Sequence, residues 1–176
     1  MSATETFIAS DGSFFPEALV DAAAAALDAA KKKKWRIGVA ETVTSGLVSA
    51  CVTSVSGASQ IFERGYVLYH ESAKASGLGL PPDVAAKYGA VSREVTVGLA
   101  EGVLANSGAG VAIAVTGYAG PGGGSAANPV GTIFIAAASR GSETRTERHV
   151  FSGSRDNVRL NAVLAALRLL VRQIEA

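Results

Sequence analysis

The chain has 176 residues, of which 48% are hydrophobic and 18% are charged, and its formal net charge is +1. This composition excludes a disordered chain, and the length suits one domain with a substantial core. The weak charge gives no field that would attract nucleic acid or a membrane surface, and no apolar run reaches the roughly 18 residues of a membrane span.

The pattern of apolar residues predicts strands that alternate with helices. Pro16 is placed to open the first helix, Gly89 closes a short one, and Ser92 caps the next. In chain order we expect a helix over 18–34, a strand over 36–40, a helix over 46–55, a strand over 64–69, helices over 81–89 and 92–105, strands over 110–115, 130–138 and 147–151, and a helix over 156–174. This alternation indicates a layered α/β domain.

The only cysteine, Cys51, falls on the same helical face as Leu47, Val48 and Val55, so we expect a buried structural thiol. A single cysteine cannot form an internal disulfide, which suits a reducing compartment. The first ten residues lack the basic start and apolar core of a signal peptide. A cytoplasmic protein is therefore predicted.

Two groups of basic or metal-binding side chains favour an ordinary interpretation. The lysines of 31–34 end a helix, where cations are favoured by the helix dipole and face water. His70 and His149 stand alone, without the spacing of metal ligands. We therefore expect neither a metal nor a cofactor.

A carboxylate and three hydroxyls crowd into the turn between the first strand and the second helix, at Glu41, Thr42, Thr44 and Ser45. The ordinary interpretation is helix capping, because Thr and Ser accept bonds from the free N–H groups of a first turn. A hydroxyl in such a turn can also be a nucleophile, and the turn's N–H groups suit an anion or an oxyanion.

A glycine-rich segment, Thr116-Gly-Tyr-Ala-Gly-Pro-Gly-Gly-Gly124, directly follows a predicted buried strand. Glycines there let the backbone wrap closely around a ligand and present N–H groups to a phosphate. The segment is not a Walker loop, because no Gly-Lys-Ser/Thr follows. A flexible hairpin loop is the alternative.

Two arginines, Arg155 and Arg159, stand four residues apart at the start of the last helix. Like charges repel at this spacing and a helix N-terminus disfavours them, so we expect a phosphate or carboxylate partner, with protein acids as the alternative. Tyr69 and Lys74 lie just past a predicted strand end, where open α/β sheets place their ligands. A lysine in a desolvated pocket can lose its proton and act as a base.

Together these motifs resemble the CinA C-terminal domain family, which includes nicotinamide mononucleotide deamidases. The motifs keep their order and spacing from about residue 14 to 174, as RGYVLYHESAK (64–74), GAVS (89–92), VTGYAGPGGG (115–124), PVGT (129–132) and FSGSRDNVR (151–159). The resemblance implies a three-layer α/β/α sandwich around a mixed, mostly parallel five-stranded sheet. It suggests one domain over residues 14–176 after an N-terminal extension, residues 1–13, and a homo-oligomer.

The resemblance also implies roles for individual residues. Thr42 stands at the position of the nucleophilic serine, assisted by Tyr69 and Lys74. The implied substrate-binding set is Thr44, Ser45, Gly46, Thr116, Gly117, Gly120, Gly122, Arg155 and Arg159, with the 44–46 N–H groups on the oxyanion and the rest on phosphate and ribose. The implied reaction converts nicotinamide mononucleotide to nicotinate mononucleotide and ammonia.

The chain departs from the family's usual Ala-Glu-Ser-x-Thr-Gly-Gly at two positions, because Thr42 replaces the serine and Ser45 the first glycine. A third departure is Asn128, where relatives often carry lysine. Thr42 keeps a hydroxyl, but its methyl hinders attack. A catalytically weak or silent nucleotide-binding or regulatory member of the family is therefore the alternative function.

Overall fold

The computed structural model describes residues 14–176. The predicted N-terminal extension, residues 1–13, lies outside the described residues, so the domain boundary at residue 14 stays a prediction. No helix of the described chain combines the length and apolarity that crossing a bilayer requires.

The centre of the molecule is a five-stranded sheet with the order β2-β1-β3-β4-β5. Its strands are β1 (Ile37–Glu41), β2 (Phe62–Val67), β3 (Val111–Gly117), β4 (Thr132–Ser139) and β5 (Ser142–Val150). β1 pairs in parallel with β2 and β3, whereas β4 runs antiparallel to both of its neighbours. Since β4 alone runs against the others, the predicted mixed, mostly parallel sheet is confirmed.

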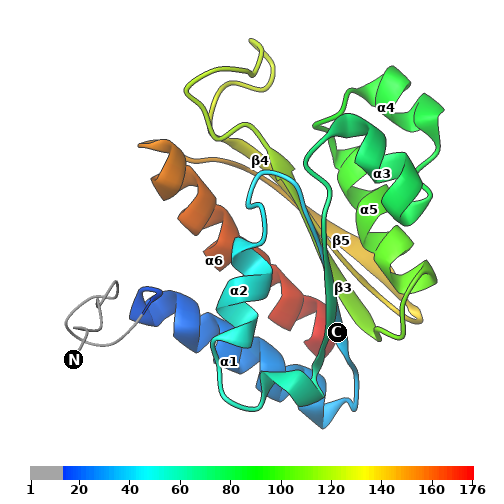
Figure 1. Ribbon diagram of the computed structural model, residues 1–176, viewed down its shortest axis with the longest axis vertical. Coiled ribbons are helices and arrows are strands. Elements are labelled where there is room, and N and C mark those ends of the chain that lie inside the picture. Colours follow the sequence, from blue (N-terminus) through cyan, green and yellow to red (C-terminus); the bar gives the residue numbers. More distant parts are fainter. Residues whose placement is uncertain (1–13) are drawn as a thin grey trace, which may run out of the picture.

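Helices cover both faces of this sheet, as the predicted three-layer sandwich requires (Figure 1). One layer contains α1 (Glu17–Lys32), α2 (Leu47–Thr53) and α6 (Arg155–Glu175). The other contains α3 (Glu71–Leu78), α4 (Pro82–Tyr88) and α5 (Arg93–Ala105). A 3₁₀ turn, η1 (Ala58–Gln60), precedes β2.

The two faces of the sheet carry side chains of different size. Toward α1, α2 and α6 the strands present large aliphatics such as Ile37, Ile113 and Ile135. Toward α5 they present alanines, among them Ala112 and Ala136. Short side chains let a helix approach the sheet closely, so α5 packs directly against the strands on this face.

Most predicted elements occur in the structure within a few residues of their expected bounds, but two features were missed. The segment of α3 contains serine, glycine and lysine without an apolar stripe, so its sequence did not indicate a helix. This helix packs through Leu78, and its N-cap is His70, whose ring accepts the Ser72 N–H. β5 begins five residues earlier than expected, since Ser142–Val150 replaces 147–151. Its first half was not predicted because residues 142–146 contain only polar and charged side chains, without the apolar alternation of a strand.

Candidate active site

The predicted site residues meet where β1 and β3 end, the edge at which α/β sheets bind ligands. A cavity of about 250 Å³ opens there. It brings together seven residues singled out from the sequence: Thr42, Tyr69, Lys74, Gly117, Gly120, Gly122 and Arg155. The other predicted residues, Thr44, Ser45, Gly46, Thr116 and Arg159, are not among those lining it.

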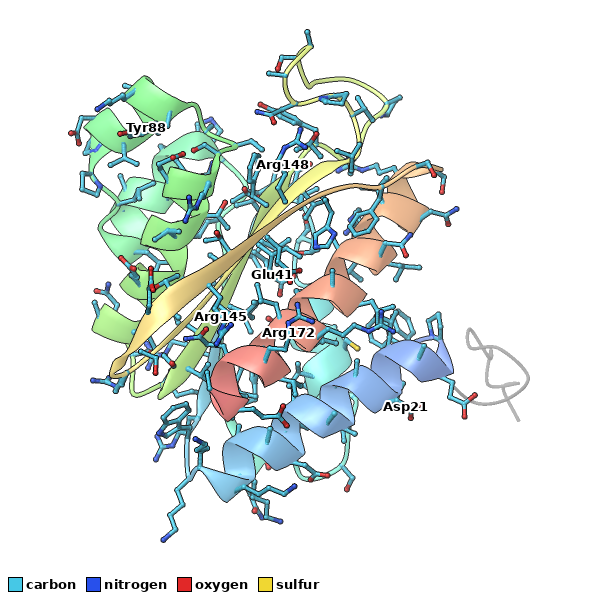
Figure 2. All side chains as sticks on the ribbon, turned by 180° about the vertical axis from the view of Figure 1, so that it is seen from behind. Asp21, Glu41, Tyr88, Arg145, Arg148 and Arg172 are labelled. Atoms are coloured by element: carbon cyan, nitrogen blue, oxygen red, sulfur yellow. The ribbon has the colours of Figure 1, made fainter. Side chains whose placement is uncertain are left out.

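The turn after β1 is built around Glu41, a fully buried carboxylate inside the molecule (Figure 2). Its Oε2 accepts the N–H groups of Gly46 at 2.9 Å and Val48 at 3.0 Å. Its Oε1 accepts the N–H of Ser49 at 2.9 Å and the Ser49 hydroxyl at 2.7 Å. Glu41 therefore fixes the start of α2 from the interior of the protein, because its carboxylate binds the free N–H groups of the first turn of the helix. This role of Glu41 was not predicted, although an acid just ahead of a helix start is a capping signal.

Thr42 follows directly and is held by the neighbouring strand. Its N–H donates to the Val115 carbonyl at 3.1 Å, and its Oγ1 donates to the same carbonyl at 3.2 Å. The side chain is 8% exposed and lines the cavity. The hydroxyl thus reaches the cavity wall from a backbone fixed at the end of β3.

The rest of the turn is left-handed. Ser45 has φ +51° and Gly46 has φ +95°, a region that L side chains rarely adopt. The Ser45 hydroxyl donates to the Thr42 carbonyl at 3.1 Å, and its side chain is exposed away from the cavity. The Ser45 and Gly46 N–H groups are already taken by the Thr42 carbonyl and by Glu41. They are not available to hold an oxyanion in this arrangement.

Lys74 enters the cavity from α3. Its side chain is 5% exposed, and its Nζ donates to the Ala90 carbonyl at 2.6 Å. Ala90 belongs to the turn before α5, which Ser92 closes by accepting the Val95 N–H at 3.3 Å. A buried amine is therefore aimed at the cavity by the packing of two helices.

Arg155 and Arg159, in the first two turns of α6, have different partners. Arg155 donates to the Gly120 carbonyl at 2.8 Å and to the Tyr69 hydroxyl at 3.1 Å, so it ties the glycine-rich loop to the cavity rim. Arg159 donates to the carbonyls of Val43 at 3.2 Å and Thr44 at 3.1 Å. Their mutual repulsion is offset because each guanidinium is bound to separate backbone carbonyls. Arg159 also lies 3.6 Å from Asp156 Oδ1, so the expected protein acid is present for this arginine.

The glycine-rich loop leaves β3, projects away from the sheet and returns at β4 (Figure 1). A Cβ on Gly117 would lie 2.5 Å from the Thr132 carbonyl oxygen, so no side chain fits there, whereas one on Gly122 would meet nothing within 4 Å. Tyr118, which the sequence analysis passed over, also lines the cavity. Where the loop returns toward β4, Arg148 donates to the Ala127 carbonyl at 2.9 Å and to Asn128 Oδ1 at 3.2 Å.

Thr116 lies beneath the cavity and not in its wall. Its hydroxyl is fully buried and lies 2.7 Å from that of Thr96, which donates to the Ser92 carbonyl at 2.6 Å. This pair joins the end of β3 to the first turn of α5. Thr116 thus connects the glycine-rich loop to the turn that receives Lys74.

Comparison with known proteins shows the family to which this chain belongs. Residues 20–174 match the family model of the CinA C-terminal domain. The chain belongs to the CinA C-terminal domain family. A CinA-like protein of Myxococcus xanthus is 42% identical over 88% of this chain, and the chain spans 37% of that relative's length. The nicotinamide-nucleotide amidohydrolase PncC of Escherichia coli K12 is 41% identical over 82% of this chain and 88% of its own.

Solved structures agree with this assignment to the CinA family. The competence/damage inducible protein CihA of Agrobacterium tumefaciens superposes with a TM-score of 0.89 at 34% identity, covering 92% of this chain and 98% of that one. A competence damage-inducible protein of Klebsiella pneumoniae superposes with a TM-score of 0.84 at 32% identity, over 89% and 97% of the two chains.

Other reactive groups of this CinA-family chain lie away from the cavity. Cys51 is fully buried, as predicted, and burial raises the pKa of its thiol to about 11, which leaves it without nucleophilic character at neutral pH. Within residues 14–176 no three His, Cys, Asp or Glu side chains gather as metal ligands would. The cavity itself is lined by a hydroxyl, an amine and a guanidinium, those of Thr42, Lys74 and Arg155.

Proposed function

We propose that this protein is an amidohydrolase that converts nicotinamide mononucleotide to nicotinate mononucleotide and ammonia. The observation that carries the proposal is the cavity itself, in which the Thr42 hydroxyl, the buried Lys74 amine and the Arg155 guanidinium meet. Its support from relatives is the 41% identity to proteins named nicotinamide-nucleotide amidohydrolase.

In this reaction Thr42 Oγ1 attacks the carboxamide carbon of the substrate. In this proposal Lys74 is the base, which takes the hydroxyl proton and passes it to the leaving nitrogen. The C–N bond breaks, ammonia departs, and an ester remains on Thr42. Water then attacks this ester, which releases nicotinate mononucleotide and restores the hydroxyl. To attack, Oγ1 must turn away from the Val115 carbonyl that it contacts at 3.2 Å.

The negative charge that develops on the carboxamide oxygen needs an N–H donor in the cavity wall. Val43 lines the cavity directly after Thr42, and its N–H has no hydrogen-bond partner in the described part of the chain. We assign the oxyanion to this N–H, since those of Ser45 and Gly46 are engaged and Thr44 does not line the cavity.

The phosphate of the mononucleotide is assigned to Arg155 and the glycine-rich loop. Arg155 lies in the cavity rim at the first turn of α6, where the helix dipole adds to its charge. Tyr118 offers an aromatic face in the same cavity for the flat pyridine ring. Arg159 contributes indirectly in this proposal, because it holds the Val43 and Thr44 carbonyls of the turn.

The deciding experiment measures ammonia released from nicotinamide mononucleotide by the wild-type chain and by Thr42 variants. Thr42→Val keeps the shape but removes the hydroxyl, so turnover should fall by at least about a thousandfold. Thr42→Ser should raise turnover by about tenfold, because the methyl no longer restricts χ1. Thr132→Val is the matched control, since it removes a buried hydroxyl that has no partner.

The same assay tests the alternative of a silent nucleotide-binding member. The contact of the Thr42 hydroxyl with the Val115 carbonyl favours that alternative, because it turns the hydroxyl away from a substrate. If wild type releases no ammonia yet binds the mononucleotide in calorimetry, the binding function replaces the enzymatic one. If wild type shows neither ammonia release nor binding of the mononucleotide, both functions are excluded.

A further inference from the structure

Within residues 14–176 the strand β5 forms one edge of the sheet and pairs only with β4. Figure 2 shows it running along the outside of the molecule between the α5 and α6 layers. It is the longest strand, and its side chains are exposed or half-buried throughout. An uncovered edge of this kind presents a row of unpaired backbone N–H and C=O groups that another strand can join.

A hollow of about 430 Å³ lies along this edge. Six consecutive residues of β5, Ser142 to Glu147, contribute to it. Successive side chains of a strand point to opposite faces, so a hollow touched by all of them lies over the edge itself. Arg93 of α5 and Arg172 of α6 border it on either side.

The charged side chains of β5 are arranged so that the strand is complementary to an antiparallel copy of itself. Arg145 and Glu147 flank Thr146, and strand alternation places them on the same face. Glu147 contacts Arg172 and His149 of its own chain, whereas Arg145 forms no ion pair within the described residues. Figure 2 shows Arg145 next to α6 and its Arg172.

We propose that β5 pairs with β5 of a second copy of this chain, antiparallel and around a two-fold axis through Thr146, so that the sheet continues across the dimer. Arg145 of each copy then lies opposite Glu147 of the other, and Thr146 lies opposite itself. Opposite charges and paired threonines both stabilise directly facing strand positions.

The same charges exclude the two directly neighbouring registers. A two-fold axis perpendicular to the sheet keeps the α6 layers of both copies on one face. Facing side chains then point to the same face, so one residue of β5 must lie opposite its own copy, with the axis midway between the two. An axis through Arg145 would set this arginine against its own copy. An axis through Glu147 would set two glutamates against each other, and like charges at facing positions destabilise the pair. An axis at Thr144 would also pair Glu143 with Arg145, but it would align only residues 142–146 of the two strands, whereas an axis at Thr146 aligns the whole of Ser142–Val150.

The opposite edge of the sheet lacks this pattern. β2 is shorter, and Arg64 donates to the adjacent Glu63 at 2.8–3.0 Å, so its charges are satisfied within the strand. The dimer proposal is independent of the proposed activity, because β5 does not contribute to the cavity that holds Thr42.

Charge reversal followed by mixing tests the interface, with sedimentation velocity as the measurement. Wild type should be a concentration-dependent dimer. Arg145→Glu and Glu147→Arg should each weaken self-association by about tenfold or more, since the two-fold axis applies every substitution twice. An equimolar mixture of the two should associate as wild type does, because each mixed pair regains opposite charges. Lys87→Glu, a reversal at an exposed position of α4 that does not border the hollow, should leave association unchanged.

Amide hydrogen exchange measures the same interface without any variant. On dilution of wild type below its dissociation constant, the outward N–H groups of β5 should exchange faster while those of β3 stay protected. This result also decides the matter if Glu147→Arg does not fold. A wild-type monomer at all concentrations, a dimer insensitive to both reversals, folded variants that do not associate when mixed, or exchange in β5 that ignores dilution would each overturn the proposal.

Discussion

The two segments that form the candidate cavity are held in opposite ways. The turn after β1 is held from inside, because the buried carboxylate of Glu41 accepts four hydrogen bonds from residues 46–49. The glycine-rich loop is held from outside, because Arg155 and Arg148 bind its carbonyl oxygens while residues 121–127 stay exposed.

This difference separates two tasks. A nucleophile needs a backbone position that does not shift, and a buried network supplies it. A loop that closes on a phosphate needs backbone that can approach the ligand, and glycines anchored at a few points supply that. Loss of a turn contact should therefore affect stability, whereas loss of a loop contact should affect substrate affinity.

Breaking the inner network should have the largest effect on stability. Glu41→Ala leaves three N–H groups without their acceptor, so the free energy of unfolding should fall by about 3–5 kcal/mol. Glu41→Gln keeps one acceptor oxygen and should lose less. Urea denaturation followed by circular dichroism measures both, with Glu94→Ala on the exposed face of α5 as control. A Glu41→Ala variant as stable as the control would mean that the turn is not held by this carboxylate.

Arg155 and Arg159 allow the sharpest comparison, since one holds the glycine-rich loop and the other holds the turn after β1. Arg159→Ala should lower the free energy of unfolding by about 1.5–3 kcal/mol, because the turn carbonyls lose charged donors. Arg155→Ala should leave that quantity nearly unchanged and weaken binding of the mononucleotide by about 10- to 100-fold. Denaturation and calorimetry on both variants give the four values. Equal effects of the two substitutions on affinity would contradict the division of tasks.

The smallest effect is expected at Ser45. Ser45→Gly removes the Cβ from a backbone with φ +51° but also removes the hydroxyl bond to the Thr42 carbonyl. The strain of about 1 kcal/mol and the lost bond nearly cancel, so the free energy of unfolding should change by less than about 1 kcal/mol. Turnover should stay within about twofold, because Ser45 does not line the cavity. A tenfold gain in turnover would show that its Cβ does reach the substrate.

Much of the fold could be predicted from local pattern alone. The buried strands at 110–115 and 130–138 and the long final helix have periodicities that packing did not alter. Tyr69, Lys74, the glycine-rich loop and the turn after β1 could be singled out because core packing does not require polar or glycine-rich segments at strand ends, and Arg155 because a helix start disfavours a cation. The choice of Thr42 within its turn came from the resemblance to the family. β5 and α3 could not be delimited, since an edge strand and a surface helix carry charges with no apolar period.

The sequence by itself determined the layered α/β domain and the residue types that the cavity collects, because hydrophobic periodicity and glycine placement act over a few residues. Only the tertiary structure decided what each polar side chain contacts. Arg155 and Arg159 look alike in the chain, yet one binds a loop 35 residues away and the other a turn more than 100 residues away. Such partners depend on where the strands bring distant backbone carbonyls, which no local pattern records.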